Sequence, residues 1–243
     1  MNVVSIIQAR MGSTRLPGKV LRNIGGRTVL AQTFLRAARA DRTSSTVIAT
    51  TTGENDNAVV AEAEALGAPV FRGSEDDVLE RYYQTASAFE ADAVVRITSD
   101  CPLIDPGVID HVIEAFISGA PDYASNILQR TYPRGLDTEV FTVDALKRAW
   151  KGADKPYQRV HVTPYMYQNH DRFRCVAVTA AADYSRHRWT VDTADDLEFL
   201  RAVCARIEDP ITATWNEVIE CVESEPRLQE MNKHVRQKSL HEG

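Results

Sequence analysis

The apolar run VVSII at residues 3–7 leads directly into QARMGSTRLPGK at residues 8–19. A short run rich in β-branched residues is typical of a buried strand. The segment that follows contains two glycines, two hydroxyl side chains, three cations and a proline. Such a loop offers backbone N–H groups and positive charge at the carboxyl edge of a sheet, where open α/β folds bind ligands. We therefore predict a polyphosphate-binding loop here, rather than a merely solvated basic loop.

The charge distribution supports a small anionic ligand. Residues 1–42 contain eight Lys or Arg and one acid, a local charge of +7, whereas the whole chain carries −6. The remainder therefore carries −13, which disfavours general binding to nucleic acid or to an anionic membrane. We predict neither kind of partner.

The composition is that of an ordinary globular protein, with 243 residues, 44% of them hydrophobic and 26% charged. No apolar run approaches the length of a transmembrane helix, and we expect no secretory signal. The cysteines lie far apart, which suits a reducing compartment better than a disulfide framework or a zinc site. We predict a cytoplasmic protein.

Strand and helix patterns alternate through the first half of the chain, which favours a parallel sheet with helices on both faces. Thr28 is a candidate N-cap and Gly67 a candidate C-cap for two of the helices. The predicted strands are 3–7, 46–51, 69–71 and 93–98, and the predicted helices are 28–40, 55–67, 78–89 and 106–117.

The second half is less regular. We predict strands at 138–141, 173–178 and 188–191, and helices at 143–150 and 194–207. Residues 123–133 lack periodicity and are interpreted as a loop or insertion that covers the site. Without an internal linker or repeat, residues 1–222 are predicted to form one domain, followed by a polar tail at 223–243 that is either frayed or an interface arm.

The basic loop is not a P-loop. Gly12 and Gly18 enclose five residues instead of four, and Val20 replaces the hydroxyl residue that would hold magnesium. The Rossmann glycine pattern is also absent from the sequence. These departures disfavour a P-loop kinase or GTPase and a dinucleotide-binding fold.

Two aspartates are candidates for metal binding. Asp100 follows the strand at 93–98 and would lie on the same sheet edge as the basic loop. Mg²⁺ commonly takes one or two carboxylates together with phosphate oxygens. Asp192, at the end of the strand predicted at 188–191, is the best second ligand. Its alternative role is to cap the helix that follows, although Thr193 and Asp195 are also candidate caps.

Several motifs resemble those of the sugar-acid cytidylyltransferases, which include the 3-deoxy-octulosonate and acylneuraminate activating enzymes. The closer resemblance is to the spore-coat polysaccharide biosynthesis F branch, and it extends over residues 3–205. The motifs are IIQAR at 6–10, STRLPGKVL at 13–21, FRGSEDDVL at 71–79, RIT at 96–98, DCPLID at 100–105, YPRGLD at 132–137, HVTPY at 161–165 and RWTVDT at 188–193.

The resemblance implies a nucleotide-diphospho-sugar transferase fold, a single α/β domain with a mostly parallel, mixed sheet. It implies transfer of a nucleoside monophosphate from a nucleoside triphosphate, with CTP favoured, to a sugar or sugar acid, with release of pyrophosphate. A homodimer is implied by the resemblance alone. The octulosonate enzymes have glutamate where this chain has Cys101, so their particular substrate does not carry over.

The resemblance also implies roles for individual residues. Asp100 and Asp192 match the metal-binding aspartates and would hold Mg²⁺. Arg15 and Lys19 are our candidates for stabilising the transition state. The remaining nucleotide-binding candidates are Arg10 and Ser13 at the triphosphate, Ala9, Thr50 and Thr51 beside the base, and Arg81, which would reach a phosphate.

The acceptor side is predicted from polar residues within the same motifs or, for Glu139, two positions after one of them: Arg134, Asp137, Glu139, His161 and Arg188. Arg134 or Arg188 would pair with a substrate carboxylate in a bidentate fork. Two alternatives remain open. The motif RGLD at 134–137 would also form a turn held by its own ion pair, and His161 would also serve as a buried, hydrogen-bonded histidine.

Two other functions fit the same fold. A glycosyltransferase that uses a nucleotide-sugar is the main alternative, but such enzymes usually hold metal through an Asp-x-Asp pair, and residues 99–101 read SDC. A regulatory nucleotide-binding domain is the other, and the joint presence of Arg15, Lys19, Asp100 and Asp192 speaks against it. The sequence specifies neither the sugar nor, from its own residues, the base.

Overall fold

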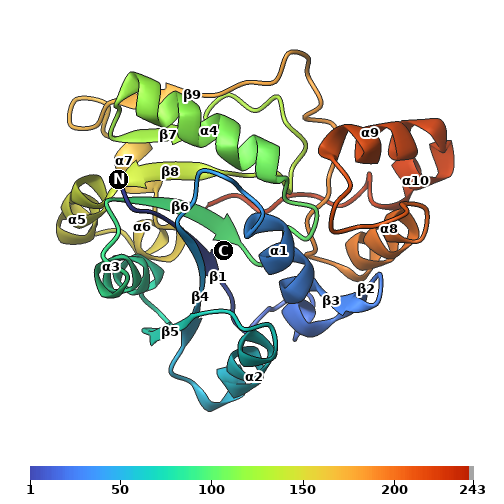
Figure 1. Ribbon diagram of the computed structural model, residues 1–243, viewed down its shortest axis with the longest axis horizontal. Coiled ribbons are helices and arrows are strands. Elements are labelled where there is room, and N and C mark those ends of the chain that lie inside the picture. Colours follow the sequence, from blue (N-terminus) through green and yellow to red (C-terminus); the bar gives the residue numbers. More distant parts are fainter. Residues whose placement is uncertain (241–243) are drawn as a thin grey trace.

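A seven-stranded mixed sheet lies at the centre of the computed structural model, which describes residues 1–240 (Figure 1). Its order is β5-β4-β1-β6-β8-β7-β9, and the first four strands in this order are parallel. The strands are β1 (Val3–Gln8), β4 (Ser45–Thr51), β5 (Val70–Gly73), β6 (Ala93–Thr98), β7 (Tyr123–Ser125), β8 (Glu139–Thr142) and β9 (Cys175–Ala177). The predicted mostly parallel, mixed sheet is confirmed.

Helices cover both faces of this sheet, as predicted, because successive residues of a strand point to opposite faces. Val3 and Ile7 of β1 belong to a core with α1 (Val29–Ala37), α2 (Asn57–Ala65) and α4 (Pro106–Gly119). Val4 and Ile6 belong to a second core with α3 (Val78–Ala88), α5 (Val143–Gly152) and α7 (Pro164–Tyr167). The short α6 (Pro156–His161) contacts α3.

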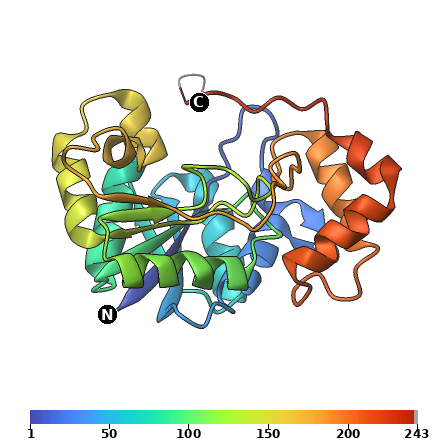
Figure 2. The same ribbon diagram turned by 90° about the horizontal axis from the view of Figure 1, so that it is seen from above.

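A third core lies beside the sheet and contains the C-terminal helices (Figure 2, orange to red). These are α8 (Ala194–Cys204), α9 (Trp215–Ser224) and α10 (Pro226–Met231). They pack with the small hairpin of β2 (Asn23–Ile24) and β3 (Arg27–Thr28), which follows the 3₁₀ turn η1 (Lys19–Leu21). A second 3₁₀ turn, η2 (Glu54–Asp56), precedes α2.

The sheet order places a ligand-binding crevice between β1 and β6. The chain moves outward from β1 to β4 and β5, then crosses back to form β6 on the other side of β1. Open α/β sheets bind ligands outside the carboxyl ends of the strands at such a reversal. The basic loop after β1 and the aspartate after β6 therefore lie at the same crevice.

The helix ends expected from the sequence are present. The Thr28 hydroxyl accepts a hydrogen bond from the Ala31 N–H at 2.9 Å and caps α1. Gly67, just after α2, has a left-handed φ of 66°, which glycine adopts without strain. Within residues 1–240, no helix combines the length and apolar character needed to cross a bilayer.

A loop and a strand predicted in the second half differ from the structure. Residues 123–125, assigned to a covering loop, form the buried strand β7, which pairs with β8 and β9. The Ser125 hydroxyl donates to the Thr138 carbonyl at 2.8 Å, so its polar group is satisfied inside the sheet. Residues 188–191 do not form a strand; Arg188 makes only an isolated parallel bridge with Arg134.

The predicted polar tail also differs. Residues 223–224 complete α9, and α10 follows with Leu228 only 1% exposed in the third core. Leu228 anchors this otherwise polar segment to the third core. Because the other residues are mostly polar, the composition alone suggested a frayed end. Residues 241–243 of the predicted tail lie outside the described residues.

Candidate active site

The loop between β1 and η1 is held closed at both ends. The Gly18 N–H donates to the Met11 carbonyl at 3.1 Å, and the Met11 N–H donates to the Asp56 carboxylate at 2.6 Å. Gly18 has a left-handed φ of 67°, a conformation that favours glycine. This closure lets Lys19 begin η1 with its side chain facing the ends of β1 and β6.

Lys19 joins the two predicted metal-binding aspartates. Its ammonium donates to Asp100 Oδ2 at 2.7 Å, to Asp192 Oδ1 at 2.9 Å and to the Val191 carbonyl at 2.7 Å. Arg15 Nη2 also lies 2.9 Å from Asp192 Oδ1. The structure thus brings the two candidate cations and the two candidate acids into one cluster.

The ion pairs of the cluster shift the pKa values of its members. Burial alone would raise the pKa of Asp192, but Lys19, Arg188 and Arg15 outweigh it and lower that pKa to about 2. Burial would lower the pKa of Lys19, but the carboxylates of Asp100 and Asp192 raise it above its ordinary value. Both groups are therefore charged at neutral pH, and each neutralises the other.

Backbone hydrogen bonds bring the segment around residue 190 to Asp100. The Val191 N–H donates to the Asp100 carbonyl at 2.8 Å, and the Thr190 hydroxyl donates to the same carbonyl at 3.2 Å. Thr193 caps α8, in a reciprocal capping box with Asp196. The alternative role for Asp192 as the helix cap is therefore filled by its neighbour, and its carboxylate is left to the cluster.

A cavity of about 400 Å³ opens beside this cluster along the basic loop. We refer to it as the nucleotide cavity. Burial lowers the pKa of the Arg81 guanidinium, which donates to the Ser74 carbonyl. Of the predicted residues, those that line the cavity are Ala9, Arg10, Ser13, Arg15, Lys19, Arg81, Asp100, His161 and Asp192.

Thr50 and Thr51, predicted to lie beside the base, are fully buried at the end of β4 and do not line this cavity. The Thr51 hydroxyl donates to Asp56, the residue that also receives the Met11 N–H. The end of β4 thus supports the loop from behind. The expected contact with the base is not supported by this placement, because Asp56 engages the hydroxyl inside the protein.

A second cavity of about 290 Å³ adjoins the first. We refer to it as the acceptor cavity. The two cavities share Gln8, Thr98, Asp100, His161 and Asp192 as lining residues, and the acceptor cavity adds Arg96, Arg134 and Asp137. The two aspartates therefore belong to the common wall.

Arg134 reaches the acceptor cavity because two loops approach very closely. Gly135 has φ 108°, and a Cβ there would lie 2.7 Å from the Trp189 carbonyl carbon. Only glycine permits this contact without displacement. The Arg134 N–H donates to the His187 carbonyl at 3.0 Å, and the Trp189 N–H donates back to the Arg134 carbonyl at 2.6 Å.

Arg134 and Asp137 do not pair with each other, so the expected alternative of a turn held by its own ion pair is not what forms. Asp137 instead accepts a bidentate pair from Arg130, at 2.6 and 2.9 Å. No carboxylate within residues 1–240 forms an ion pair with Arg134. Burial and repulsion from Arg130 lower the pKa of Arg134, as expected for a cation without its own acid.

Two predicted acceptor residues lie elsewhere. Glu139 is 2% exposed within the sheet, where it accepts hydrogen bonds from Arg96, from Tyr123 at 2.6 Å and from Thr163 at 2.5 Å. Its position as the first residue of β8 turns the carboxylate into the core, so it supports Arg96 instead of facing a substrate.

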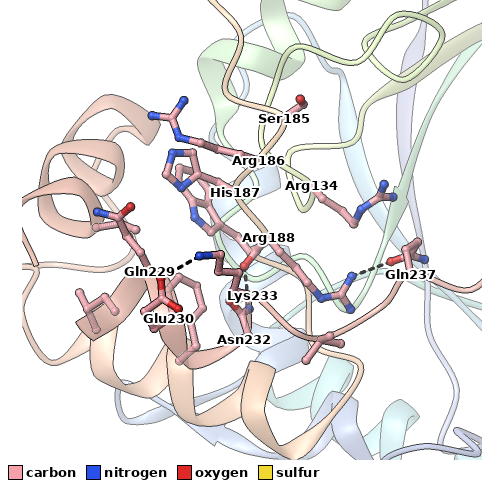
Figure 3. A pocket seen from close by; sticks show the side chains of 15 residues that line it. Arg134, Ser185, Arg186, His187, Arg188, Gln229, Glu230, Asn232, Lys233 and Gln237 are labelled. Atoms are coloured by element: carbon pink, nitrogen blue, oxygen red, sulfur yellow. Dashed lines mark hydrogen bonds and ion pairs between the residues drawn. The ribbon is translucent and has the colours of Figure 1, made fainter. Parts of the chain in front are cut away.

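Arg188 is also engaged by the protein. Its guanidinium donates to Asp192 at 2.7 Å and to Asp196 at 2.9 Å. It lines neither the nucleotide nor the acceptor cavity but a third cavity beside α10, which shares Arg134 and Gln237 with the acceptor cavity (Figure 3). Arg188 therefore orients Asp192, and Arg134 is the better placed of the two arginines predicted to pair with a substrate carboxylate.

Sequence reasoning missed Gln8 and Arg96. Gln8 lines both cavities, and its side-chain carbonyl is buried with no hydrogen-bond partner in the described chain. Both residues lie inside motifs that had been recognised, at 6–10 and 96–98. The available signal was their position: Gln8 ends β1, and Arg96 lies two residues before the carboxyl end of β6.

The cluster also fits a divalent cation. Carboxylate oxygens of Asp100 and Asp192 converge on one ammonium, so their charge is directed at a single position. Mg²⁺ is suited to one or two carboxylates plus phosphate oxygens and waters. No group of three or more His, Cys, Asp or Glu that would chelate a metal occurs within residues 1–240, so phosphate oxygens and waters would complete the coordination.

Comparison with known families decides the identity of this arrangement. The family described as Cytidylyltransferase matches residues 4–233. The chain belongs to the cytidylyltransferase family. As a member of this family it is a nucleotidyltransferase, as the sequence motifs had predicted.

Individual relatives agree with this assignment. The spore coat polysaccharide biosynthesis protein SpsF of Bacillus subtilis is 34% identical and aligns over 93% of this chain and 95% of its own. A 3-deoxy-manno-octulosonate cytidylyltransferase of Solibacter usitatus is 34% identical over 68% of this chain and 71% of its own. The resemblance of this cytidylyltransferase to the spore-coat branch is thereby confirmed.

A solved structure supports the fold as well as the family. A cytidylyltransferase from Leptospira borgpetersenii serovar Hardjo-bovis superimposes with a TM-score of 0.91 at 32% identity. The match covers 98% of this chain and all of the other. The predicted nucleotidyltransferase architecture is therefore confirmed over almost the entire cytidylyltransferase.

Proposed function

We propose that this cytidylyltransferase joins CMP from CTP to a sugar or sugar acid, releases pyrophosphate, and supplies the activated sugar for surface polysaccharide synthesis. The observation that carries the proposal is the Lys19–Asp100–Asp192 cluster at the wall shared by two adjoining cavities. The family description and the names of the Bacillus and Solibacter relatives support the nucleotide and the acceptor class.

The geometry suits an in-line displacement. The acceptor hydroxyl would attack the α-phosphorus from the acceptor cavity, while pyrophosphate would leave along the basic loop. Negative charge grows on the equatorial and leaving oxygens, and preorganised cations stabilise it. Arg15 and Lys19 line the nucleotide cavity and are the residues we propose for that stabilisation.

Asp100 and Asp192 would hold Mg²⁺, which when bound neutralises charge on the phosphate oxygens. Lys19 and Arg15 are paired with these acids in the structure. Their ammonium and guanidinium groups would be released toward the triphosphate when the carboxylates acquire another cation. The divalent ion would take the place of Lys19 and Arg15 at the carboxylates, and the two freed side chains would bind the triphosphate. Binding of the ion and binding of the nucleotide are therefore coupled.

Arg134 is our candidate for the acceptor's carboxylate. A guanidinium binds a carboxylate through two parallel hydrogen bonds, and Arg134 faces the acceptor cavity without an acidic partner in the described chain. Asp137 and His161 line the same cavity and would bind hydroxyl groups of the sugar. This arrangement favours a sugar acid over a neutral sugar.

Pyrophosphate release provides the direct test. The protein is incubated with Mg²⁺, each of the four nucleoside triphosphates and a panel of acidic and deoxy-amino sugars. Release that requires both CTP and an acidic sugar is the expected result. Turnover of a nucleotide-sugar without pyrophosphate would instead identify a glycosyltransferase. Absence of nucleotide binding in calorimetry would contradict the proposal itself.

The proposed enzyme would act as a cytoplasmic homodimer, the assembly implied by its sequence resemblance. Light scattering of the purified protein checks the assembly, and a mass of about twice 27.1 kDa is expected. Fractionation of cells that produce the protein checks its location. A monomeric mass would overturn the dimer and leave the reaction untouched.

A further inference from the structure

Residues 233–240, which we call the C-terminal strap, run back from α10 across the carboxyl edge of the sheet. In Figure 2 the red strap leaves the C-terminal helices and passes by the basic loop, in blue. The cavities agree with this path, because Gln237 lines the acceptor cavity and Lys238 lines the nucleotide cavity. The strap therefore spans both halves of the proposed site.

The strap begins at a fixed point. Asn232 is 5% exposed, and its side-chain amide donates to the Arg188 carbonyl and to Asp196 Oδ1, both at 3.0 Å. The Val235 N–H then donates to the Asn232 carbonyl at 3.0 Å and turns the chain. These bonds direct the following residues toward the crevice.

A second contact holds the middle of the strap. Arg188 Nη1 donates to the Gln237 side-chain carbonyl at 2.6 Å (Figure 3). The same guanidinium donates to Asp192 at 2.7 Å. Arg188 thus links the strap directly to one of the two acids of the cluster.

The strap carries the charge that a polyphosphate requires. Its sequence KHVRQKSL contains three cations and no carboxylate. Arg15 and Lys19 are paired with acids, whereas no carboxylate of residues 1–240 forms an ion pair with Lys238. Lys238 is therefore a cation at the nucleotide cavity that has no acid within residues 1–240 to give up when it binds a phosphate.

We propose that Lys238 binds the triphosphate of the nucleotide and that the C-terminal strap forms one wall of the nucleotide cavity. Gln237 is a positioning residue, which holds the strap through Arg188. The inference rests on the proposed function, because the phosphate ligand is taken to be CTP. It adds a binding residue about 220 positions beyond the loop that the sequence identifies.

The test compares two lysines of the same strap by calorimetry with CTP and Mg²⁺. Lys238→Met should weaken CTP binding roughly five- to tenfold, the loss of one exposed charge-assisted contact, and Lys238→Arg should keep most of the affinity. Lys233→Met is the matched control, since Lys233 lines neither the nucleotide cavity nor the acceptor cavity and pairs with Glu230 at 3.0 Å on the surface. It should leave the CTP affinity unchanged.

The position of the strap has its own test. Gln237→Ala should also weaken CTP binding, because Lys238 is then no longer held in position. In the Lys238→Met background, Gln237→Ala should cause no further loss of CTP affinity. Melting temperatures of all variants should match the wild type, because both side chains are exposed.

The outcomes separate this inference from the proposed function. Equal losses in Lys233→Met and Lys238→Met would mean a general charge effect and would overturn the role of Lys238. Normal CTP binding by Lys238→Met would overturn it too, with the cytidylyltransferase reaction intact. If the wild type binds no CTP at all, the proposed function fails, and the strap's role with it.

Discussion

Lys19 and Asp100 lie 81 positions apart in the sequence, yet the Lys19 ammonium is 2.7 Å from the Asp100 carboxylate. The same ammonium contacts Asp192 at 2.9 Å, so it stands where a cation between two acids is required. The lysine of the basic loop thereby keeps two converging carboxylates stable before any ligand arrives. It also becomes the group that the ligands must displace.

Replacing Lys19 by methionine should lower kcat about 10²-fold or more, because a cation near the developing phosphate charge is lost. KM for CTP should change much less, since Arg15 and the rest of the loop remain. Steady-state kinetics of pyrophosphate release measures both constants. A rise in KM with unchanged kcat would show that Lys19 acts only in binding.

The same variant should bind divalent cations more tightly in the absence of nucleotide. Lys19 occupies the space between Asp100 and Asp192, and its removal leaves two acids without their shared ammonium. Titration with Mn²⁺, followed by paramagnetic resonance, measures this affinity. The double variant Lys19→Met, Asp100→Asn should not show this increase in Mn²⁺ affinity. If the increase persists, the ion binds elsewhere.

Asp192→Asn should destabilise the protein at neutral pH but not in acid. The folded-state pKa of Asp192, about 2, lies below its ordinary value of 3.8, so its ion pairs stabilise the fold above pH 4. That contribution, of the order of 2 kcal/mol, is lost as the pH falls toward 2. Urea unfolding should show the same difference between wild type and variant at pH 7 and pH 5, and a clearly smaller difference at pH 3. A constant difference would contradict the assigned ion pairs.

Arg134→Met should raise KM for an acidic acceptor by about 10²-fold, as expected for the loss of a bidentate charge-assisted pair. CTP affinity, measured by calorimetry, should stay within twofold. Arg130→Met serves as the comparison, because Arg130 does not line the acceptor cavity and acts there only through its pair with Asp137. Its loss should therefore affect acidic and uncharged acceptors alike. If Arg134→Met raises KM for an uncharged analogue of the acceptor as much as it raises KM for the acid, Arg134 does not bind the carboxylate.

Local patterns were sufficient to predict the parallel half of the sheet. Residues 93–98 were predicted as a strand and form β6, and Thr28 caps α1 as its side chain suggested. The short strand β7 was missed because three buried residues give too little periodicity, and its partners β8 and β9 come later in the chain. Its stability depends on pairing that a local pattern does not encode.

The residues of the site likewise divide into those that the sequence predicted and those that it did not. Arg15, Lys19, Asp100 and Asp192 were predicted from their motifs, and the structure places them in one cluster. Glu139 is a polar residue within a recognised region, but the direction of its side chain depends on the register of β8, which turns it into the core. Lys238 had no local signal, because only the folding of α10 returns the strap to the crevice.

The hydrogen bond from Lys19 to Asp192 spans 173 positions, so the first motif of the chain stays incomplete until its last third has folded. During synthesis on the ribosome, the basic loop emerges early and without its acidic counterpart. A nascent chain of 150 residues would present the cations of the loop but not the residues 188–193 that orient them. Nucleotide affinity should therefore appear late and abruptly, and it would report that folding of the chain is complete.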